Sequence, residues 1–169
     1  NIYHIERILN YWPEARIIHI IRDPRDIFAS LKEAKKWDTV DVFLEKWLPL
    51  FIALKNSKKN TDNLEKYYYE IRYEDLILNP SKIMEKVSKF LAIPFEIQTA
   101  DFNGNPNDFE KVRSVTGKES STLKRLSKPI EKNRIGIWRN ILNDVEICEI
   151  ESKITNFGLS DVYKDVCYK

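Results

Sequence analysis

The sequence has few of the residues on which disulfide-rich, glycosylated or membrane proteins depend. It holds two cysteines, Cys148 and Cys167, and four glycines in 169 residues, with no Asn-x-Ser/Thr glycosylation acceptor in which x is not proline. Two cysteines do not make a disulfide framework, so a reducing, cytoplasmic location is expected. No apolar run approaches the roughly 18 residues of a membrane helix, and we expect no membrane span in this chain.

A secretory leader is also missing from the start of the chain. Glu6, Arg7 and Trp12 interrupt any apolar stretch there, and Asn1 follows no methionine, so the first residue is interpreted as a cut end. The length of 169 residues suits a single domain that is large enough to bury a core. We therefore expect one domain over residues 1–169, incomplete at its N-terminus.

The net charge of +2 is distributed unevenly. Residues 111–139 hold nine Lys/Arg and two Asp/Glu, a net +7, and the remaining residues carry −5. A local basic segment favours an anionic ligand over a nucleic-acid coat. The alternative is a solvated loop whose lysines bind nothing specific.

Hydrophobic periodicity predicts an alternating α/β order with a mainly parallel sheet flanked by helices. A final helix should end at Gly158, and a long functional loop with at most short helices should fill residues 96–136. The expected helices cover residues 1–11, 24–36, 40–58 with a kink at Pro49, 80–93 and 144–157, and the expected strands cover 16–21 and 67–73.

The clearest local signal lies in residues 13–31, PEARIIHIIRDPRDIFASL. RIIHII is a nearly continuous β-branched run, typical of a central parallel strand that is covered on both faces. Asp23 at the cap position, Pro24 at the first helical position and Asp26 three residues after the cap then predict a helix with its first amides satisfied. This strand, turn and helix form a candidate phosphate-binding segment.

Arg22 stands where the strand ends and the helix begins. Ligands bind at the carboxyl ends of parallel strands, and a guanidinium there can hold a phosphate in bidentate fashion. Ser30 follows the cap by about two helical turns, on the same helix face, so the two side chains could share one phosphate. The alternative is that Arg22 pairs only with Asp23 or Asp26 and that Ser30 is simply small.

Three segments resemble the sulfotransferases that use 3′-phosphoadenosine 5′-phosphosulfate (PAPS). They are RIIHIIRDPRDIFASL, then IRYEDLILNPSKIMEKVSKFLAIPF at 71–95, and KPIEKNRIGIWRNIL at 128–142, in the family's order. The resemblance implies a P-loop-type sulfotransferase fold, with PAPS as sulfuryl donor and no metal.

The resemblance also implies roles for particular residues. Arg22 and Ser30 match the pair that holds the nucleotide's 3′-phosphate, and Tyr73 matches an aromatic residue that contacts the adenine. Tyr73 taken alone would be a half-buried core aromatic. The basic loop supplies Lys132, Asn133 and Arg134 as further candidate ligands on the 3′-phosphate side.

The chain departs from the family where the chemistry takes place. Nothing before Arg16 resembles the glycine-containing P-loop that holds the 5′-phosphosulfate, and TGKESS at 116–121 is no substitute because Val112 stands where a Walker loop needs glycine. His4 and His19 are interpreted as structural, no cluster with metal-ligand spacing is present, and no catalytic residue is assigned.

The predicted function is transfer of a sulfuryl group from PAPS to a hydroxyl or amine acceptor. This chain supplies the part of the cofactor site that binds the 3′-phosphate and adenine, and by itself it should have little or no turnover. Two alternatives are a non-catalytic nucleotide-binding or interaction domain that has lost the P-loop, and, ranked last, a nucleic-acid-binding module. The acceptor and the oligomeric state are not legible in the sequence.

Overall fold

The computed structural model describes residues 2–61, 63–100 and 131–159. The chain divides into two compact units. The first unit comprises Asn1–Glu74 and Arg134–Lys169, and the second comprises Asp75–Asn133. Each unit is described by itself.

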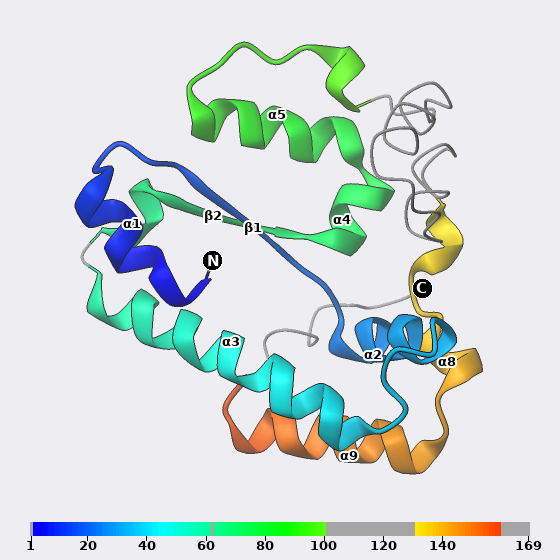
Figure 1. The fold of residues 1–169 in the computed structure, drawn as a ribbon. Helices are drawn as coiled ribbons and strands as arrows, with labels where there is room; N and C mark the ends of the chain where they lie inside the picture. Colours follow the sequence, from blue (N-terminus) through cyan, green and yellow to red (C-terminus); the bar gives the residue numbers. More distant parts are fainter. Residues whose placement is uncertain (1, 62, 101–130, 160–169) are drawn as a thin grey trace, which may run out of the picture. The chain divides into compact units, whose positions relative to one another are not determined.

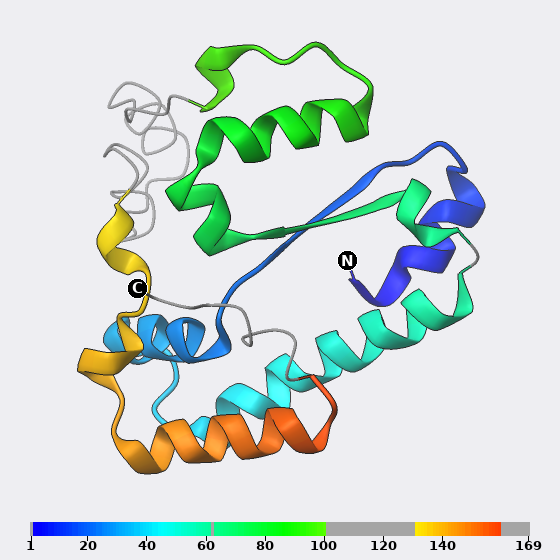
Figure 2. The ribbon, with the colours of Figure 1, turned by 180° about the vertical axis from the view of Figure 1, so that it is seen from behind.

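The first unit places several helices around a small sheet (Figures 1 and 2). Both views show α3 and α9 side by side along one border of this unit. In chain order its elements are η1 (Ile2–His4), α1 (Ile5–Tyr11), β1 (Ile17–Ile21), α2 (Pro24–Glu33), α3 (Val40–Asn60), η2 (Leu64–Lys66), β2 (Tyr68–Arg72), α8 (Trp138–Ile141) and α9 (Asp144–Asn156).

The second unit is helical in the residues described. Helix α4 begins in the first unit and crosses into the second, and the amphipathic α5 follows it directly. The elements are α4 (Tyr73–Leu78), α5 (Pro80–Leu91), η3 (Ile97–Ala100) and η4 (Lys132–Arg134), the last of which ends in the first unit. No described helix is both long and apolar enough to span a membrane.

The two strands pair in parallel, as the sequence predicted, with a register that runs from Ile17 opposite Tyr68 to Ile21 opposite Arg72. The prediction that β1 is covered on both faces is wrong. Ile21 is buried, but Ile18 is 39% and Ile20 is 52% exposed. Among the described residues the sheet has only these two strands, so one face of β1 stays open at alternate positions.

The main core of the first unit is aromatic. Phe28 of α2 is fully buried and its ring lies 5.4 Å from that of Phe43 in α3. Trp47 and Phe51 continue the stripe along α3, with ring centroids 4.0 Å apart. This stripe follows the i, i+4 spacing of α3, so the aromatic pattern that predicted the helix also fixes the side that faces α2.

The helix ends agree with the local signals, except in α2. Helix α9 ends as predicted before Gly158, which has a φ of +66°. Helix α2 stops at Glu33 rather than near Lys36, because Lys35 adopts a left-handed φ of +51° and the Lys36 amide donates to the Leu31 carbonyl at 3.0 Å. Helix α3 continues through Pro49 as one helix.

The aromatic run at 67–73 forms a shorter strand than predicted. Tyr73 lies outside β2 and is instead the first residue of α4, a helix that the sequence pattern did not predict. In the predicted loop 96–136, the described residues form η3 and η4, in agreement with short helices only. The basic residues Lys111, Arg113, Lys118, Lys124, Arg125 and Lys128 lie outside the described residues.

Candidate functional site

Arg22 lies directly after the carboxyl end of β1, as predicted. Its guanidinium donates from Nη2 to the Arg134 carbonyl oxygen at 2.7 Å and stacks over the Tyr73 ring, 4.7 Å from the ring centroid. Its Nε is buried and has no hydrogen-bond partner among the described residues. A buried N–H donor without an acceptor is costly, so this atom is suited to an incoming anionic ligand.

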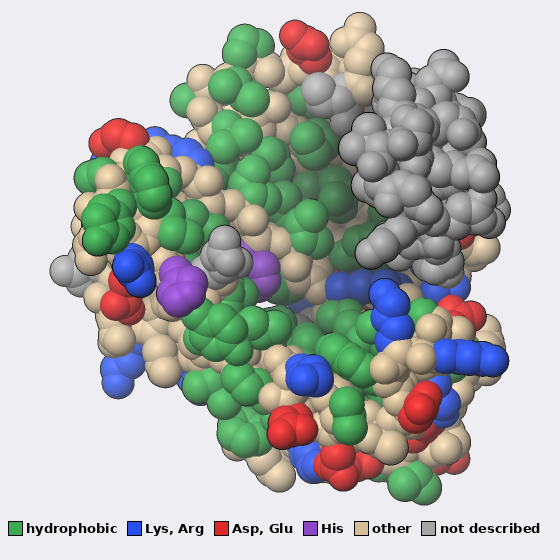
Figure 3. Space-filling view, viewed as in Figure 1, with side chains coloured by type: hydrophobic (Ala, Val, Ile, Leu, Met, Phe, Trp, Pro, Cys, Tyr) green, Lys and Arg blue, Asp and Glu red, His purple; other side chains and the backbone are tan. Residues whose placement is uncertain are grey.

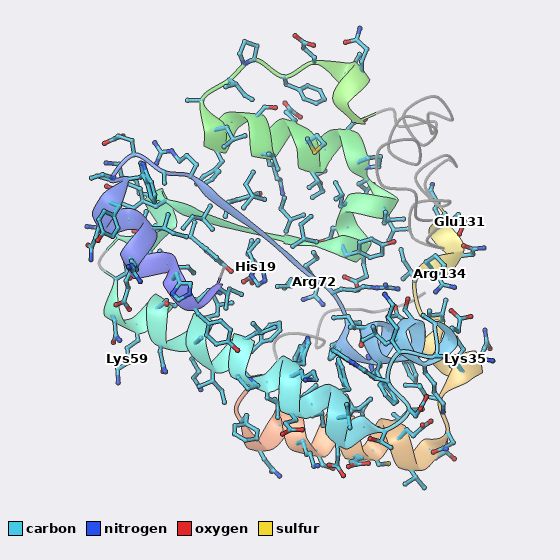
Figure 4. All side chains as sticks on the ribbon, in the orientation of Figure 1. His19, Lys35, Lys59, Arg72, Glu131 and Arg134 are labelled. Carbon is cyan, nitrogen blue, oxygen red and sulfur yellow. The ribbon has the colours of Figure 1, made fainter. Side chains whose placement is uncertain are left out.

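Ser30, which lies on α2, contacts the side chain of Arg134. Arg134 Nη2 lies 3.5 Å from Ser30 Oγ and 2.7 Å from a carboxylate oxygen of Glu33. Figure 4 labels Arg134 next to α2 in the first unit. Because Arg22 bonds to the backbone of Arg134 while Ser30 contacts its side chain, the three residues form one cluster.

Asp23 caps α2 and holds Arg25. Its side chain accepts the Arg25 amide at 2.9 Å, and its two carboxylate oxygens accept Arg25 Nε at 3.0 Å and Nη2 at 2.7 Å. Asp23 is fully buried, and Arg25, 9% exposed, also donates to Glu151 at 2.6 Å and lies 4.2 Å from the centroid of the Trp138 ring. This bidentate pair fixes the geometry of the turn that carries Arg22.

Glu74 ties the end of β2 to the same turn. Its Oε1 accepts the Asp23 amide at 2.8 Å, and its Oε2 is buried without a hydrogen-bond partner among the described residues. Burial raises the pKa of Glu74, against the lowering effect of the bond from the Asp23 amide.

Asp26 fastens a distant segment to α2. Its carboxylate oxygens accept the Gly136 amide at 2.8 Å and the Trp138 amide at 3.1 Å, and the residue is fully buried. Burial raises the pKa of Asp26, while the two amides and the charge of Arg22 oppose the rise. The Asp26 carboxylate therefore does not bond back to the Asp23 amide, which donates to Glu74 instead.

The start of α2 also differs from the predicted phosphate-binding segment in the partners of its first backbone amides. Pro24 has no N–H, the Arg25 amide donates to Asp23, and the Ile27 amide donates to the Asp23 carbonyl at 3.0 Å. Two buried carboxylates already lie at this positive helix end. An anion would therefore be held by side chains, above all by Arg22, rather than by the first amides of the helix.

The sequence analysis left open an ion pair of Arg22 with Asp23 or Asp26. Neither pair is formed in the described part of the chain. Asp23 pairs with Arg25, and Asp26 accepts backbone amides. Arg22 donates to a neutral carbonyl oxygen, and its charge also acts on the carboxylate of Asp26 without forming an ion pair among the described residues.

The other predicted site residues lie in two places. Tyr73 is half-buried beneath Arg22. Lys132 and Asn133 are exposed residues of η4 and belong to the second unit, so they are described apart from Arg22. Sequence reasoning missed Glu74, although the run IRYED that supplied Tyr73 contains it. A polar residue directly after a strand end was a usable signal.

A second polar cluster lies in the middle of the sheet. Lys58 Nζ donates to Glu70 Oε2 at 3.0 Å, and the Tyr68 hydroxyl donates to the same oxygen at 2.8 Å. His19 Nδ1 lies 2.6 Å from the Tyr68 hydroxyl oxygen. Since the single Tyr68 proton points to Glu70, a neutral His19 must donate from Nδ1, which leaves Nε2 as its acceptor.

The charges of this second cluster follow from its bonds. Contact with His19, together with Tyr68 and Lys58, lowers the pKa of Glu70 to about 2, and burial with the Glu70 charge raises the pKa of Tyr68. Both histidines of the chain, drawn in purple, reach the face seen in Figure 3. His19 is part of this network, in keeping with the structural role predicted for it.

The described residues contain no group of three or more His, Cys, Asp or Glu side chains placed to hold a metal ion. The first cluster brings together an arginine with an unused buried donor, a serine, a second arginine and a tyrosine ring, side chains that are chemically suited to an anion.

Comparison with family models gives a match over part of the chain. A sequence model of the sulfotransferase family matches residues 1–97, more than half of the chain. The chain belongs to the sulfotransferase family. The matched range contains every element from η1 to α5, and Arg22, Ser30 and Tyr73 lie within it. The searches of curated proteins and of solved structures gave no match.

Proposed function

We propose that this chain is the nucleotide-binding part of a PAPS-dependent sulfotransferase, and that it holds the 3′-phosphate and adenine of the donor. The observation that carries the proposal is Arg22: a half-buried guanidinium at the carboxyl end of β1, stacked on Tyr73, with an unpartnered buried Nε. The match to the sulfotransferase family supports the same assignment.

The roles follow from the geometry of the cluster. Arg22 offers Nε and its remaining donors to two phosphate oxygens, as a planar guanidinium does best. Ser30 and Arg134, which already contact each other, supply further donors to the same anion. Tyr73 provides an aromatic surface next to the phosphate, where an adenine ring can stack. Lys132 and Asn133 of η4 remain proposed ligands on the 3′-phosphate side, as the family resemblance implies.

The proposed reaction is in-line transfer of a sulfuryl group from PAPS to a hydroxyl or amine. Such transfer depends mainly on positioning and on electrostatic stabilisation of spread negative charge. The residues proposed here bind the 3′-phosphate and adenine of the donor, away from the sulfuryl group. They therefore contribute binding energy and orientation rather than proton transfer. No acceptor class and no catalytic base are assigned.

Calorimetric titration with adenosine 3′,5′-bisphosphate tests the proposal. Wild type should bind it at least about tenfold more tightly than 5′-AMP, because one phosphate held by charge-assisted hydrogen bonds is worth more than about 1.4 kcal/mol. Arg22→Ala should abolish that preference, and Arg22→Lys should restore only part of it. Arg7→Ala is the matched control, since Arg7 also lies over a tyrosine ring, 5.9 Å from Tyr11.

Equal affinity of wild type for the two nucleotides would overturn the proposal, and so would an Arg22→Ala variant that keeps the preference. A transfer assay with PAPS and phenolic, carbohydrate and peptide acceptors then separates binding from catalysis. We expect little or no product from these 169 residues, and robust transfer would show that the site does more than hold the nucleotide.

A further inference from the structure

Asp26 contacts the chain segment that follows Arg134, although Asp26 is not among the proposed nucleotide ligands. Arg134 sits at the end of η4, two residues before Gly136, and no regular element holds the stretch between η4 and α8. Two backbone amides beside this stretch, those of Gly136 and Trp138, donate to Asp26 of α2 at 2.8 and 3.1 Å, in addition to the ion pair between Arg134 and Glu33.

The Asp26 contact is strong enough to place a chain segment. A buried carboxylate that accepts two backbone amides makes charge-assisted hydrogen bonds, which are about twice as strong as neutral ones. Gly136 has a φ of +74°, a backbone conformation that favours glycine. Asp26 lies one helical turn before Ser30, so the same helix that carries Ser30 also carries the anchor.

We infer that Asp26 is a positioning residue for nucleotide binding: by holding the Gly136 and Trp138 amides it places Arg134 against Ser30 and Arg22 before the ligand arrives. The inference rests on the proposed function, and it adds a reason why the second arginine, Arg134, is in position before the ligand binds. The Arg22 bond to the Arg134 carbonyl at 2.7 Å depends on the same placement.

A double-mutant cycle tests this role with a readout that a general loss of stability would not produce. Asp26→Asn keeps one oxygen acceptor but turns an amide group toward the second backbone N–H. Affinity for adenosine 3′,5′-bisphosphate should fall about tenfold, whereas affinity for 5′-AMP should change less than about twofold. In an Arg134→Ala background, Asp26→Asn should cause a smaller loss than in the wild-type background, because the guanidinium that Asp26 positions is already absent.

Asp41→Asn is the matched control, since it neutralises an aspartate of the same unit that is exposed and paired with Lys153. It should leave both affinities unchanged. Equal losses for the two nucleotides, or losses that add in the double variant, would overturn the inference. If wild type itself shows no preference for the bisphosphate, the proposed function fails instead, so the two failures are distinguishable.

Amide hydrogen exchange provides a second test that needs no variant. If Asp26 holds the segment in advance, the Gly136 and Trp138 amides should be protected in the ligand-free wild-type protein, and bisphosphate should add little protection. Rapid exchange of both amides in the free protein would contradict a pre-formed anchor, even if Asp26→Asn could not be produced in folded form.

Discussion

The buried pair of Asp23 and Arg25 gives the sharpest prediction about stability. Asp23→Ala removes a helix cap, worth about 1 kcal/mol, and leaves Arg25 buried without its bidentate partner, which costs about 3–5 kcal/mol. Asp23→Ser separates the two effects, because a serine hydroxyl can still accept the Arg25 amide that now lies 2.9 Å from the carboxylate. We expect losses of about 4 kcal/mol for the alanine variant and about 3 kcal/mol for the serine variant.

Removal of both charges should recover much of that loss. In Asp23→Ser/Arg25→Met no charge is left buried at this position, and Glu151, whose side chain is 38% exposed, can return to water. Apolar replacement of a buried ion pair is often neutral. The double variant should therefore be more stable than Asp23→Ser alone by about 2 kcal/mol.

Urea denaturation followed by far-UV circular dichroism measures these differences. With a slope of about 2 kcal/mol per molar urea, a loss of 3 kcal/mol lowers the midpoint by about 1.5 M. Asp41→Ala, which removes an exposed ion pair with Lys153, should shift the midpoint far less. The reasoning is refuted if Asp23→Ser is as stable as wild type. It is also refuted if the stability loss of the double variant equals the sum of the losses in Asp23→Ser and Arg25→Met.

The remaining predictions concern pH. The pKa of Glu70 is lowered from 4.5 to about 2, so its ionised form stabilises the fold above pH 4.5 and the contribution is lost as the pH falls toward 2. Glu70→Gln should therefore be less stable than wild type at pH 7, and urea midpoints of the two proteins should converge between pH 4.5 and 2. Glu74 has a raised pKa, so its contribution is fully present below 4.5 and is lost as the pH rises through the folded value. Glu74→Gln should be at least as stable as wild type at pH 7 and lose any advantage below pH 4.5, and a marked loss at pH 7 would contradict this reading.

Local signals in the sequence were sufficient for most of the fold. Pro24 after Asp23, Pro80 after Asn79 and Gly158 after α9 mark helix ends through contacts within a few residues, and each lies where it was predicted. The early stop of α2 was not predictable in this way, because lysine is not a residue that favours the left-handed φ found at position 35.

Other differences from the expected contacts involve residues that are distant in the sequence. Asp23 and Asp26 have the spacing of a capping box, yet the amide of Asp23 goes to Glu74, 51 residues later, and the carboxylate of Asp26 goes to Gly136, 110 residues later. A true capping box occurs at Asn143 and Glu146 of α9. Spacing shows which local bonds are possible, but competition from tertiary partners decides which ones form.

The charged residues of RDPRD divide into two groups. Asp23 and Arg25 neutralise each other, and Asp26 binds backbone amides, so three of the five residues around the turn are committed to holding it in place. Arg22 is held by contacts that leave its charge in place, a carbonyl oxygen and an aromatic ring. The buried acids therefore hold the turn in place around an arginine with which they form no ion pair among the described residues, and this arrangement supports our proposal that Arg22 binds an external anion.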